Sequence, residues 1–492
     1  MLQQLYRPDL GLLTDLYELT MSHAYRENGM EQDEAIFYLY FRKLPAGWNY
    51  AIAAGTDLVA EYLENWRFSA EDVAYLGSLK TAEGHPLFTE SFLNYLQRLR
   101  FTGRVDVLPE GELVFPNQPI LRIQAPLIQA QIIESALLNL VNFSTLIATK
   151  AARIVQAAGD GSVLEFGLRR AQGIDGSITA SRSAYIGGCS GTSNVLAGRL
   201  LGIPVKGTHA HSWVMSFDTE PEAFERYAKA MPENALFLVD TYDSIQGIKH
   251  AIAVGKKLRQ KGYRMLGIRL DSGDLAKLSK TARKMLDEAG FPEAVIVASN
   301  QLDEDLIARL RKEKAPIAVW GVGTQLVTGQ PAAAIGGVYK MAAIRKKGED
   351  WQARIKLSEN PEKISHPGQL QIRRFYENDI PIGDLLYDQL HGPSQTQAFG
   401  QKWDEGRDLL QPLLINGKRV QPPKKLSDIR AFSMRERQRF LQKWNGKTYP
   451  AKEEKGFAER KNKLIQRLSV QQNHAGKNGV QTKTNESAIM TN

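Results

Sequence analysis

The residues with the clearest chemical potential are two histidines in a short loop. His209 and His211 lie in the string Gly-Thr-His-Ala-His-Ser, which directly follows an apolar segment. An imidazole can act as a base or as a nucleophile at neutral pH. A His-x-His pair could also bind a metal ion, but no cysteine or clear third ligand lies nearby. We therefore expect nucleophilic or acid–base chemistry here, with a histidine buried in the core as the alternative.

Arginines follow or interrupt two apolar segments. Arg169 and Arg170 follow Val163–Phe166 after Gly167 and Leu168, and such a pair suits a carboxylate or a phosphate. Arg269 lies inside the apolar string Gly-Ile-Arg-Leu, so we expect it to face the interior and bind a ligand or the nearby Asp271. For Arg169 and Arg170, the alternative is an ordinary pair of surface side chains.

Acidic and hydroxyl side chains follow the neighbouring apolar segments. Asp240 and Asp243 follow one segment, Asp271 and Asp274 the next, and Ser299 the one after. Carboxylates placed in this way can hold Mg²⁺ through oxygen ligands or orient ribose hydroxyls. The same residue types cap helices, and the two roles are compatible. Asp240 and Asp271 are the candidate Mg²⁺ ligands.

Two glycine-rich turns are candidate anion sites. The string Gly321-Val322-Gly323-Thr324 follows an apolar segment and would present backbone N–H groups and a hydroxyl to a phosphate. The run from Ala184 to Asn194 is the second turn, and close packing between chain segments explains it equally well. Cys189 lies within this run without an evident base, which indicates a structural thiol.

These polar residues follow short apolar runs that alternate with helical segments from Gly161 onward, which predicts a parallel sheet. The expected strands are Val163–Phe166, Ile203–Gly207, Ala235–Val239, Arg264–Leu270, Ala294–Ala298, Ile317–Trp320 and Gly337–Met341. The strand count favours an irregular TIM-like α/β barrel, with a doubly wound sheet as the alternative. In such barrels the active site lies at the carboxyl ends of the strands, so we expect the polar residues to converge there.

Four regions are expected along the chain. Residues 1–150 mix helical and strand patterns and predict an N-terminal α+β domain, and residues 151–345 form the α/β barrel with the active site. Residues 346–468 form a C-terminal extension that packs on the other domains, with a basic amphipathic helix from Leu426 to Trp444. Residues 469–492 are polar and expected to be disordered.

Composition excludes several classes of protein. The 492 residues are 43% hydrophobic and 24% charged, as in globular proteins. A single cysteine excludes an internally cross-linked secreted scaffold and favours the cytoplasm. The apolar stretch from Leu127 to Ala148 is interrupted by polar residues, so no membrane span is expected. Residues 401–492 contain 20 Lys and Arg against 9 Asp and Glu. The net positive charge of this segment exceeds the net charge of the whole chain, which is +9, so residues 1–400 carry a slight negative charge. The body is therefore not a basic nucleic-acid binder.

The motifs together resemble one family, the nicotinate phosphoribosyltransferases. They run in order from about residue 10 to about residue 370: TDLYELTM, FRKLPAGWNYAIAAG, EFGLRRAQ, YIGGCSGTSNVLAG, GTHAHSWVMSF, VDTYDSIQG, GIRLDSGDL, IVASNQLDE, GVGTQLVTG and GGVYKM. Each string alone is weak, but their ordered combination is specific. The basic segment after residue 400 carries the least of this resemblance.

The resemblance implies that nicotinate and 5-phosphoribosyl 1-diphosphate form nicotinate mononucleotide and diphosphate in NAD salvage. It implies ATP hydrolysis through a phosphohistidine, which matches His211, and a requirement for Mg²⁺. It also implies an irregular barrel and a homodimer with shared active sites. The family's substrate contacts carry over to Tyr17, Thr208, Arg269 and Thr324. Together with the strand-end candidates above, the expected catalytic residues are His211 and Asp271. The further expected substrate-binding residues are Arg169, Ser299, Gly321 and Gly323.

Three alternatives stay open. A nicotinamide phosphoribosyltransferase shares the fold, although the Ala-His-Ser and Thr-Asp-Leu-Tyr-Glu strings favour the acid-using branch. Quinolinate phosphoribosyltransferases are related, but they are shorter and decarboxylating. The basic tail could instead bind RNA or a membrane surface, in which case binding would be salt-sensitive and lost on deletion beyond residue 460.

Overall fold

The N-terminal part of the chain is built on a seven-stranded sheet that also contains strands from the second half of the sequence. The computed structural model describes the backbone of residues 9–486 and side chains up to residue 470. The sheet contains, in spatial order, β13 (Gln352–Ala353), β12 (Gly337–Arg345), β1 (Glu34–Phe41), β5 (Leu121–Pro126), β3 (Arg104–Val107), β19 (Gln411–Ile415) and β20 (Lys418–Arg419). Within this sheet β1 is rich in aromatic residues, and every residue of it after Glu34 is buried.

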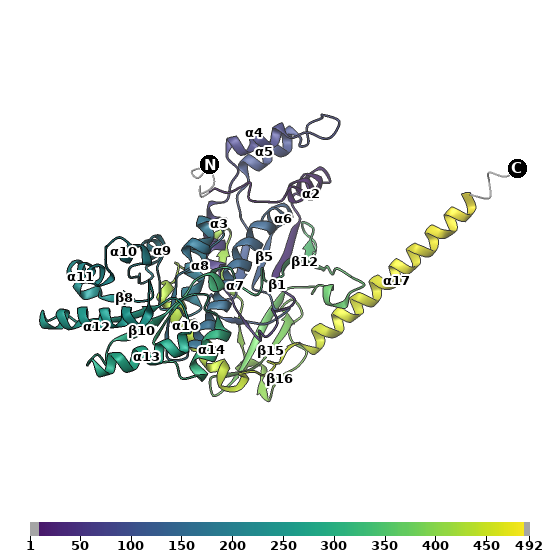
Figure 1. Ribbon diagram of the computed structural model, residues 1–492. Helices are drawn as coiled ribbons and strands as arrows, with labels where there is room; N and C mark the ends of the chain where they lie inside the picture. The colour runs from purple at the N-terminus through teal and green to yellow at the C-terminus, as the bar shows by residue number, and fades with distance from the viewer. Residues whose placement is uncertain (1–8, 487–492) are drawn as a thin grey trace.

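Helices lie around this sheet and connect it to the rest of the molecule (Figure 1). They are α2 (Leu16–Glu27), α3 (Thr56–Asn65), α4 (Ala70–Ser78), α5 (Glu90–Arg98), α6 (Leu127–Ile132) and α7 (Glu134–Ala158), and a small β2–β4 pair (Ala51–Ile52 and Leu113–Val114) lies beside them. The apolar stretch noted in the sequence forms α6 and most of α7. Within the described residues, no helix is long and apolar enough to cross a membrane.

The second sheet is parallel and carries the polar strand ends. Its order is β7 (Gly191–Thr192), β6 (Ser162–Glu165), β11 (Val319–Val322), β10 (Val295–Ala298), β9 (Gly267–Leu270) and β8 (Leu236–Leu238). The connecting helices are α8 (Gly173–Ile186), α9 (Val195–Leu201), α10 (His211–Met215), α11 (Glu220–Ala230), α12 (Ser244–Gln260), α13 (Leu275–Glu288), α14 (Glu304–Lys312) and α15 (Thr324–Val327). The predicted alternation of strands and helices is therefore confirmed.

The predicted irregular TIM-like barrel is not confirmed, and the described residues form no closed barrel. The first strand, β6, pairs with the last, β11, which is the neighbour relation of a barrel and not of a doubly wound sheet. The expected strand Ile203–Gly207 contributes one bridge, between Val205 and Thr192. After it the chain runs as coil to Ala210, so no strand joins Val205 to β8 and the sheet stays open there.

A second difference concerns Gly337–Met341, which the sequence assigned to the barrel. These residues open β12, which pairs antiparallel with β1 in the other sheet, from Glu34 opposite Arg345 to Phe41 opposite Gly337. An apolar run of this kind fits either sheet, and only long-range strand pairing decides which sheet it joins. The N-terminal layer is consequently not confined to residues 1–150, and the predicted domain boundaries stay a prediction.

The C-terminal region packs on both layers. Its sheet contains β18 (Arg407–Asp408), β14 (Leu370–Glu377), β15 (Ile380–Asp388) and β21 (Ala451–Glu453), with a β16–β17 hairpin (Gln397–Ala398 and Gln401–Lys402). The predicted basic helix is α16 (Leu426–Trp444), with the expected bounds. The last helix, α17 (Lys455–Glu486), projects from the body (Figure 1). It continues through residues 469–486, where the sequence predicted disorder; no proline interrupts it, and residues 487–492 lie outside the described residues.

Basic residues after position 400 bind the body of the protein itself. In α16, Arg430 donates hydrogen bonds to the carbonyls of Cys189 and Gly188 at 2.8 and 2.9 Å. Arg437 donates to those of Ala152 and Gly187 at 2.9 and 3.0 Å. Arg407 and Arg419 form ion pairs with Glu112 and Asp57 of the body, whereas Arg439 and Lys461 pair with Glu436 and Glu453 within the same segment. Much of the basic character of this segment is therefore structural.

The glycine turn held by α16 is closely packed, which was one of the two interpretations of the Ala184–Asn194 run. A Cβ atom on Gly187 would lie 2.3 Å from the carbonyl oxygen of Ala148. Cys189 is buried, and burial raises the pKa of its thiol to about 12. The turn thus joins α7, α8 and α16, and Cys189 is structural.

We expect Arg437→Met to destabilise the fold by about 2–3 kcal/mol, because the buried guanidinium makes two hydrogen bonds whose acceptors lose their partner. Urea denaturation followed by circular dichroism measures this loss. The matched control is Arg435→Met on the same helix, whose side chain is half exposed and should cost less than about 0.5 kcal/mol. Equal losses in the two variants would show that the carbonyl contacts do not stabilise the turn.

Candidate active site

A cluster of polar side chains lies at the carboxyl ends of β9 and β10. Arg269, on β9, donates from Nε to Ser299 Oγ at 2.9 Å and from Nη2 to Asp271 Oδ1 at 3.0 Å. The Ser299 hydroxyl in turn donates to Asp271. The register places Arg269 opposite Val297 and Leu270 opposite Ala298, so that both strands end together. The Arg269 side chain is only 19% exposed and is fixed by its two partners, while among the described residues its Nη1 has no partner.

His211 joins this cluster from the opposite side. It is the first residue of α10, and its Nδ1 lies 3.1 Å from the hydroxyl of Thr241. Its Nε2 lies 3.8 Å from Asp271 Oδ2, and the side chain is 40% exposed. The Thr241 contact orients the ring so that Nε2 faces the carboxylate. His211 is therefore both held in place and open to solvent, as a group that reacts with a ligand must be.

His209, two residues earlier, is in a different environment. It is only 6% exposed and its ring packs against Tyr227, Phe224 and Phe237. Its Nε2 accepts the backbone N–H of Leu238 at 3.3 Å. Burial lowers the pKa of this imidazole to about 4, so the ring is neutral at physiological pH. The alternative given for the two histidines thus applies to His209.

Asp240 supplies a carboxylate beside Asp271. Its Oδ2 accepts from the backbone N–H of Asp271 at 2.8 Å and from the Ser272 hydroxyl at 2.6 Å. Its Oδ1 is buried and has no hydrogen-bond partner within the described part of the chain. In the same part, no group of three His, Cys, Asp or Glu side chains could enclose a metal ion. One free carboxylate oxygen without a full cage suits Mg²⁺, which commonly binds one or two carboxylates together with substrate phosphates.

Phe166 lies beneath the arginine and is a site residue that the sequence did not single out. The Arg269 guanidinium carbon lies 5.8 Å from the centroid of the Phe166 ring. On its other side the ring approaches β11, where a Cβ on Gly321 would lie 2.7 Å from it. Gly321 is thus required by packing. A phosphate contact through Gly321, Gly323 or Thr324 stays a prediction, with Thr324 opening the short helix α15.

Beyond β6, a turn of 3₁₀-helix, η1 (Leu168–Arg170), presents the two predicted arginines. Both are exposed, and neither has an ion-pair partner among the described residues. Buried Glu165 supports this turn, since its carboxylate accepts hydrogen bonds from the backbone N–H of Gly167 and from the hydroxyls of Ser181 and Thr192. Glu165 was also missed, because a lone acid at a strand end carries no pattern of its own.

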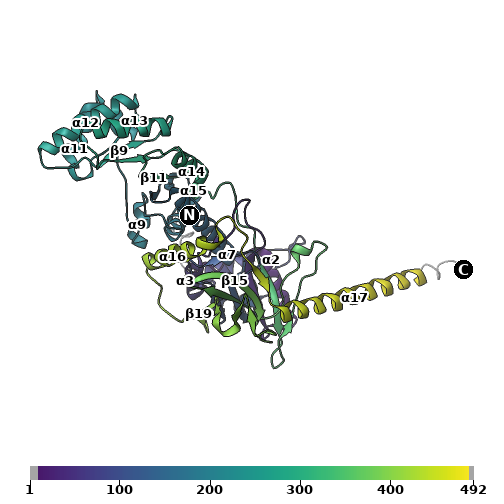
Figure 2. The same cartoon turned by 90° about the horizontal axis from the view of Figure 1, so that it is seen from below.

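Not every predicted residue is brought to the strand ends. Thr208 lies in the coil that leads to His211 and is partly exposed. Tyr17 lies on α2, which packs against α6 in the other layer. Both views place α2 away from α11, α12 and α13 of the parallel sheet (Figures 1 and 2). Within one chain, therefore, Tyr17 does not meet Arg269.

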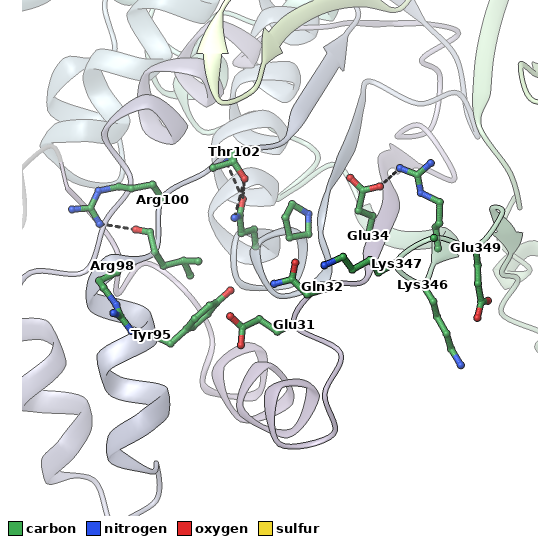
Figure 3. Close-up of a pocket in the computed structure, with 15 residues that line it drawn as sticks. Glu31, Gln32, Glu34, Tyr95, Arg98, Arg100, Thr102, Lys346, Lys347 and Glu349 are labelled. Carbon is green, nitrogen blue, oxygen red and sulfur yellow. Dashed lines mark hydrogen bonds and ion pairs between the residues drawn. The ribbon is translucent and has the colours of Figure 1, made fainter.

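A cavity of about 770 Å³ opens on the N-terminal layer, between the end of α5 and the turn after β12 (Figure 3). Tyr95, Glu31 and Lys347 line it, and none of the strand-end residues does. Two of its acids are already paired, Glu34 with Arg345 and Glu31 with Arg26. The cavity is separate from the candidate active site.

Comparison with known proteins gives a consistent result. The family model described as the N-terminal domain of nicotinate phosphoribosyltransferase matches residues 12–142, and that of the nicotinate phosphoribosyltransferase family matches residues 162–376. A Bacillus subtilis protein named nicotinate phosphoribosyltransferase is 47% identical over 395 residues, 79% of each chain. The human protein of that name is 37% identical over 470 residues, covering 84% of this chain and 85% of its own.

Solved structures agree. The structure titled human nicotinic acid phosphoribosyltransferase superposes with a TM-score of 0.79 and 31% identity, covering 92% of this chain and 99% of its own. A nicotinate-nucleotide pyrophosphorylase from Pyrococcus furiosus, at 23% identity, shares the fold, with a TM-score of 0.68 over 87% of this chain and 95% of its own.

Proposed function

The chain belongs to the nicotinate phosphoribosyltransferase family, and on this basis we propose that it joins nicotinate to 5-phosphoribosyl 1-diphosphate, releasing diphosphate and forming nicotinate mononucleotide for NAD salvage. The observation that carries the proposal is Arg269, a largely buried guanidinium held by Asp271 and Ser299 above an aromatic ring. The buried single cysteine is consistent with a reducing compartment, and we place the reaction in the cytoplasm.

Nicotinate binding follows from this arrangement. Nε and Nη2 of Arg269 are used by Ser299 and Asp271, which leaves Nη1 for the substrate carboxylate. A charged hydrogen bond in a partly desolvated site favours the acid over its neutral amide. The Phe166 ring lies beside the guanidinium and offers an apolar contact for the pyridine ring. Acid recognition is thus assigned to Arg269 and ring placement to Phe166.

The transfer step breaks the bond between ribose C1 and the diphosphate oxygen and forms a bond from C1 to the pyridine nitrogen. The departing electron pair stays on the diphosphate, so the site must stabilise developing negative charge. Arg169 and Arg170 of η1, which lack ion-pair partners among the described residues, supply positive charge. When bound, Mg²⁺ would neutralise phosphate oxygens. Asp240, with its free Oδ1, and Asp271 would hold it.

The coupling to ATP is assigned to His211. Its exposed imidazole can accept the terminal phosphoryl group of ATP, and ADP leaves with the electrons of the broken bond. The phosphoryl group would add about −1.5 to −2 charges. Asp271 Oδ2 lies 3.8 Å from Nε2 and would be repelled. Asp271 also binds Arg269 and Ser299. Phosphorylation of His211 would therefore change the nicotinate site through the Asp271 carboxylate.

The defining experiment measures nucleotide formation from 5-phosphoribosyl 1-diphosphate with nicotinate or nicotinamide, each with and without ATP. We expect turnover with nicotinate, stimulated by ATP, and at most a weak reaction with nicotinamide. Turnover with nicotinamide in its place would keep the strand-end site but overturn the assignment of Arg269. The absence of turnover with either base would refute the proposed reaction.

We further propose a homodimer in which α2 of one protomer reaches the strand ends of the other. Tyr17 is 46% exposed and stands beside the exposed apolar side chains of Leu13, Leu16 and Met21. A second exposed apolar group, Val195, Leu196 and Leu200, lies on α9 next to the parallel sheet. Two apolar patches of this kind on one chain indicate a protein–protein interface, and their association would bring Tyr17 to Arg269 of the second copy.

We expect Leu16→Asp to convert the dimer into a monomer, because a carboxylate would be buried in the apolar interface. Nucleotide formation should fall about tenfold or more, which corresponds to ~1.4 kcal/mol, since Tyr17 no longer completes the site. Light scattering coupled to gel filtration measures the mass. Leu390→Asp, at an exposed leucine of the C-terminal region, is the control and should stay dimeric. A wild-type monomer with full activity would contradict the assembly.

A further inference from the structure

The open edge of the parallel sheet leaves β8 with one unpaired side. On its inner side β8 pairs with β9: the carbonyl of Ala235 accepts from Leu266 N–H, and Val239 N–H donates to the carbonyl of Arg269. In a strand, the backbone groups of successive residues point to opposite sides. Leu238 N–H therefore points away from β9, toward the gap between β8 and residue 205, where no strand supplies a partner.

His209 occupies this gap. Its Nε2 accepts Leu238 N–H at 3.3 Å, at the place where the carbonyl of a neighbouring strand would lie in a closed barrel. The ring centroid lies 4.8 Å from that of Tyr227, 6.0 Å from Phe224 and 6.4 Å from Phe237. Leu238 is fully buried, and a buried amide without a partner is costly. The imidazole thus satisfies the backbone of the edge strand.

Among the described residues, one other hydrogen bond joins the coil from Lys206 to Ala210 to the segment just before β8. Asn234 Nδ2 reaches the carbonyl of Gly207 at 3.5 Å, at the limit of a hydrogen bond. Lys206 N–H is bonded on the other side, to the carbonyl of Thr192. His209 is therefore the main connection between this coil and the edge of the sheet. Thr208 precedes it and His211 follows it by two residues, so the position of both depends on this contact.

We propose that His209 is a positioning residue: its neutral ring takes the place of a missing strand, joins the coil 206–210 to β8, and thereby places Thr208 and His211 at the strand ends. The part concerning His211 and Thr208 rests on the proposed function, whereas the contact with Leu238 does not. Because Nε2 is committed to the Leu238 amide and the ring is buried, His209 does not receive the phosphoryl group.

The protonation state required by this role agrees with the surroundings of the ring. Nε2 accepts a hydrogen bond, so the proton must be on Nδ1, which lies 3.5 Å from the carbonyl of Ala210. Burial lowers the pKa of His209 to about 4, and the charges of Arg269 and His211 act in the same direction. The other titratable side chain facing the ring is that of Tyr227. Between pH 6.5 and about 4 the unfolded chain binds a proton that the folded chain does not, so stability should fall across this window as the pH is lowered.

Two substitutions test separately the two properties of His209, its hydrogen-bond acceptor and its aromatic ring. His209→Phe keeps the aromatic packing and removes the acceptor, whereas His209→Gln keeps an acceptor at the position of Nε2 and removes the ring. We expect hydrogen exchange at the Leu238 amide to be about tenfold faster or more in His209→Phe, equivalent to ~1.4 kcal/mol, and near wild type in His209→Gln. The rate of His211 phosphorylation and kcat/KM for nicotinate should fall about tenfold in His209→Phe and be largely restored in His209→Gln.

A measurement on the wild-type protein keeps the inference testable if His209→Phe does not fold. In protein labelled with ¹⁵N at histidine, the Nε2 resonance of His209 should keep its unprotonated position at pH 5.5. Protonation of His209 near its ordinary pKa, or unchanged exchange at Leu238 in His209→Phe, would overturn the inference. A failure of the proposed reaction is seen separately, as absence of nucleotide formation by the wild type with these histidine and amide signals intact.

Discussion

His211→Ala is expected to abolish phosphorylation of the protein by ATP and the ATP stimulation of nucleotide formation, while transfer continues at saturating nicotinate and 5-phosphoribosyl 1-diphosphate. His211 has an exposed imidazole at the strand ends, oriented by Thr241 and close to Asp271. The neighbouring His209 cannot replace it, because its ring is buried and its Nε2 is occupied. Incorporation of acid-labile label from γ-labelled ATP, and initial rates with and without ATP, measure the two effects.

The matched control for this experiment is His391→Ala. His391 is half exposed and pairs with Asp388 in the C-terminal region, so its loss should leave labelling and ATP stimulation unchanged. At low substrate concentration, the His211→Ala variant should resemble the wild type without ATP. Undiminished labelling of His211→Ala would show that another residue carries the phosphoryl group and would refute the role given to His211.

Arg269→Lys is expected to lower kcat/KM for nicotinate about 100-fold, or ~2.7 kcal/mol. A lysine has a single nitrogen, so it cannot bind Ser299, Asp271 and a substrate carboxylate in the fork geometry of a guanidinium. The weak reaction with nicotinamide should change much less, because the amide makes no ion pair with this residue. The ratio of the two kcat/KM values therefore measures acid recognition directly.

Arg226→Lys on α11 is a suitable control, since Arg226 forms an exposed ion pair with Glu222 away from the strand ends. It should leave both kcat/KM values within about twofold of the wild type, as surface substitutions do. If Arg269→Lys lowered the rates with nicotinate and nicotinamide equally, Arg269 would not distinguish the acid from the amide, and its role would be limited to holding Asp271 and Ser299.

The sequence could predict the strand ends because their signal is local. A short apolar run followed by polar residues indicates a buried parallel strand and its loop, and the helix Leu426–Trp444 has a clear periodic pattern. Closure of the sheet and the partner of Gly337–Met341 depend on long-range pairing, which no local pattern encodes. A barrel was therefore expected where Val205 makes one bridge and β12 joins the other sheet.

For the candidate site, too, the sequence could predict the residues with a local signal but not those that depend on long-range neighbours. Arg269 lies near the end of β9, Asp271 follows β9 and Ser299 follows β10, and the structure brings their side chains within hydrogen-bond distance. Their roles in binding and catalysis stay predictions. Phe166 and Thr241 were missed, since an aromatic residue or a threonine at a strand end is common in cores and shows its role only through its neighbours.

The sheet around β1 has a consequence for how the protein is made. β1 ends at Phe41, yet its neighbour β12 begins about 300 residues later, and β19, which pairs with β3 in the same sheet, begins about 370 residues later. Tyr38 makes a hydrogen bond to the carbonyl of Gly368, 330 residues away. Such distant contacts form slowly and leave the apolar strand uncovered in the nascent chain. The sheet is therefore completed only after the C-terminal strands have been translated, and chains truncated before those strands are expected to aggregate.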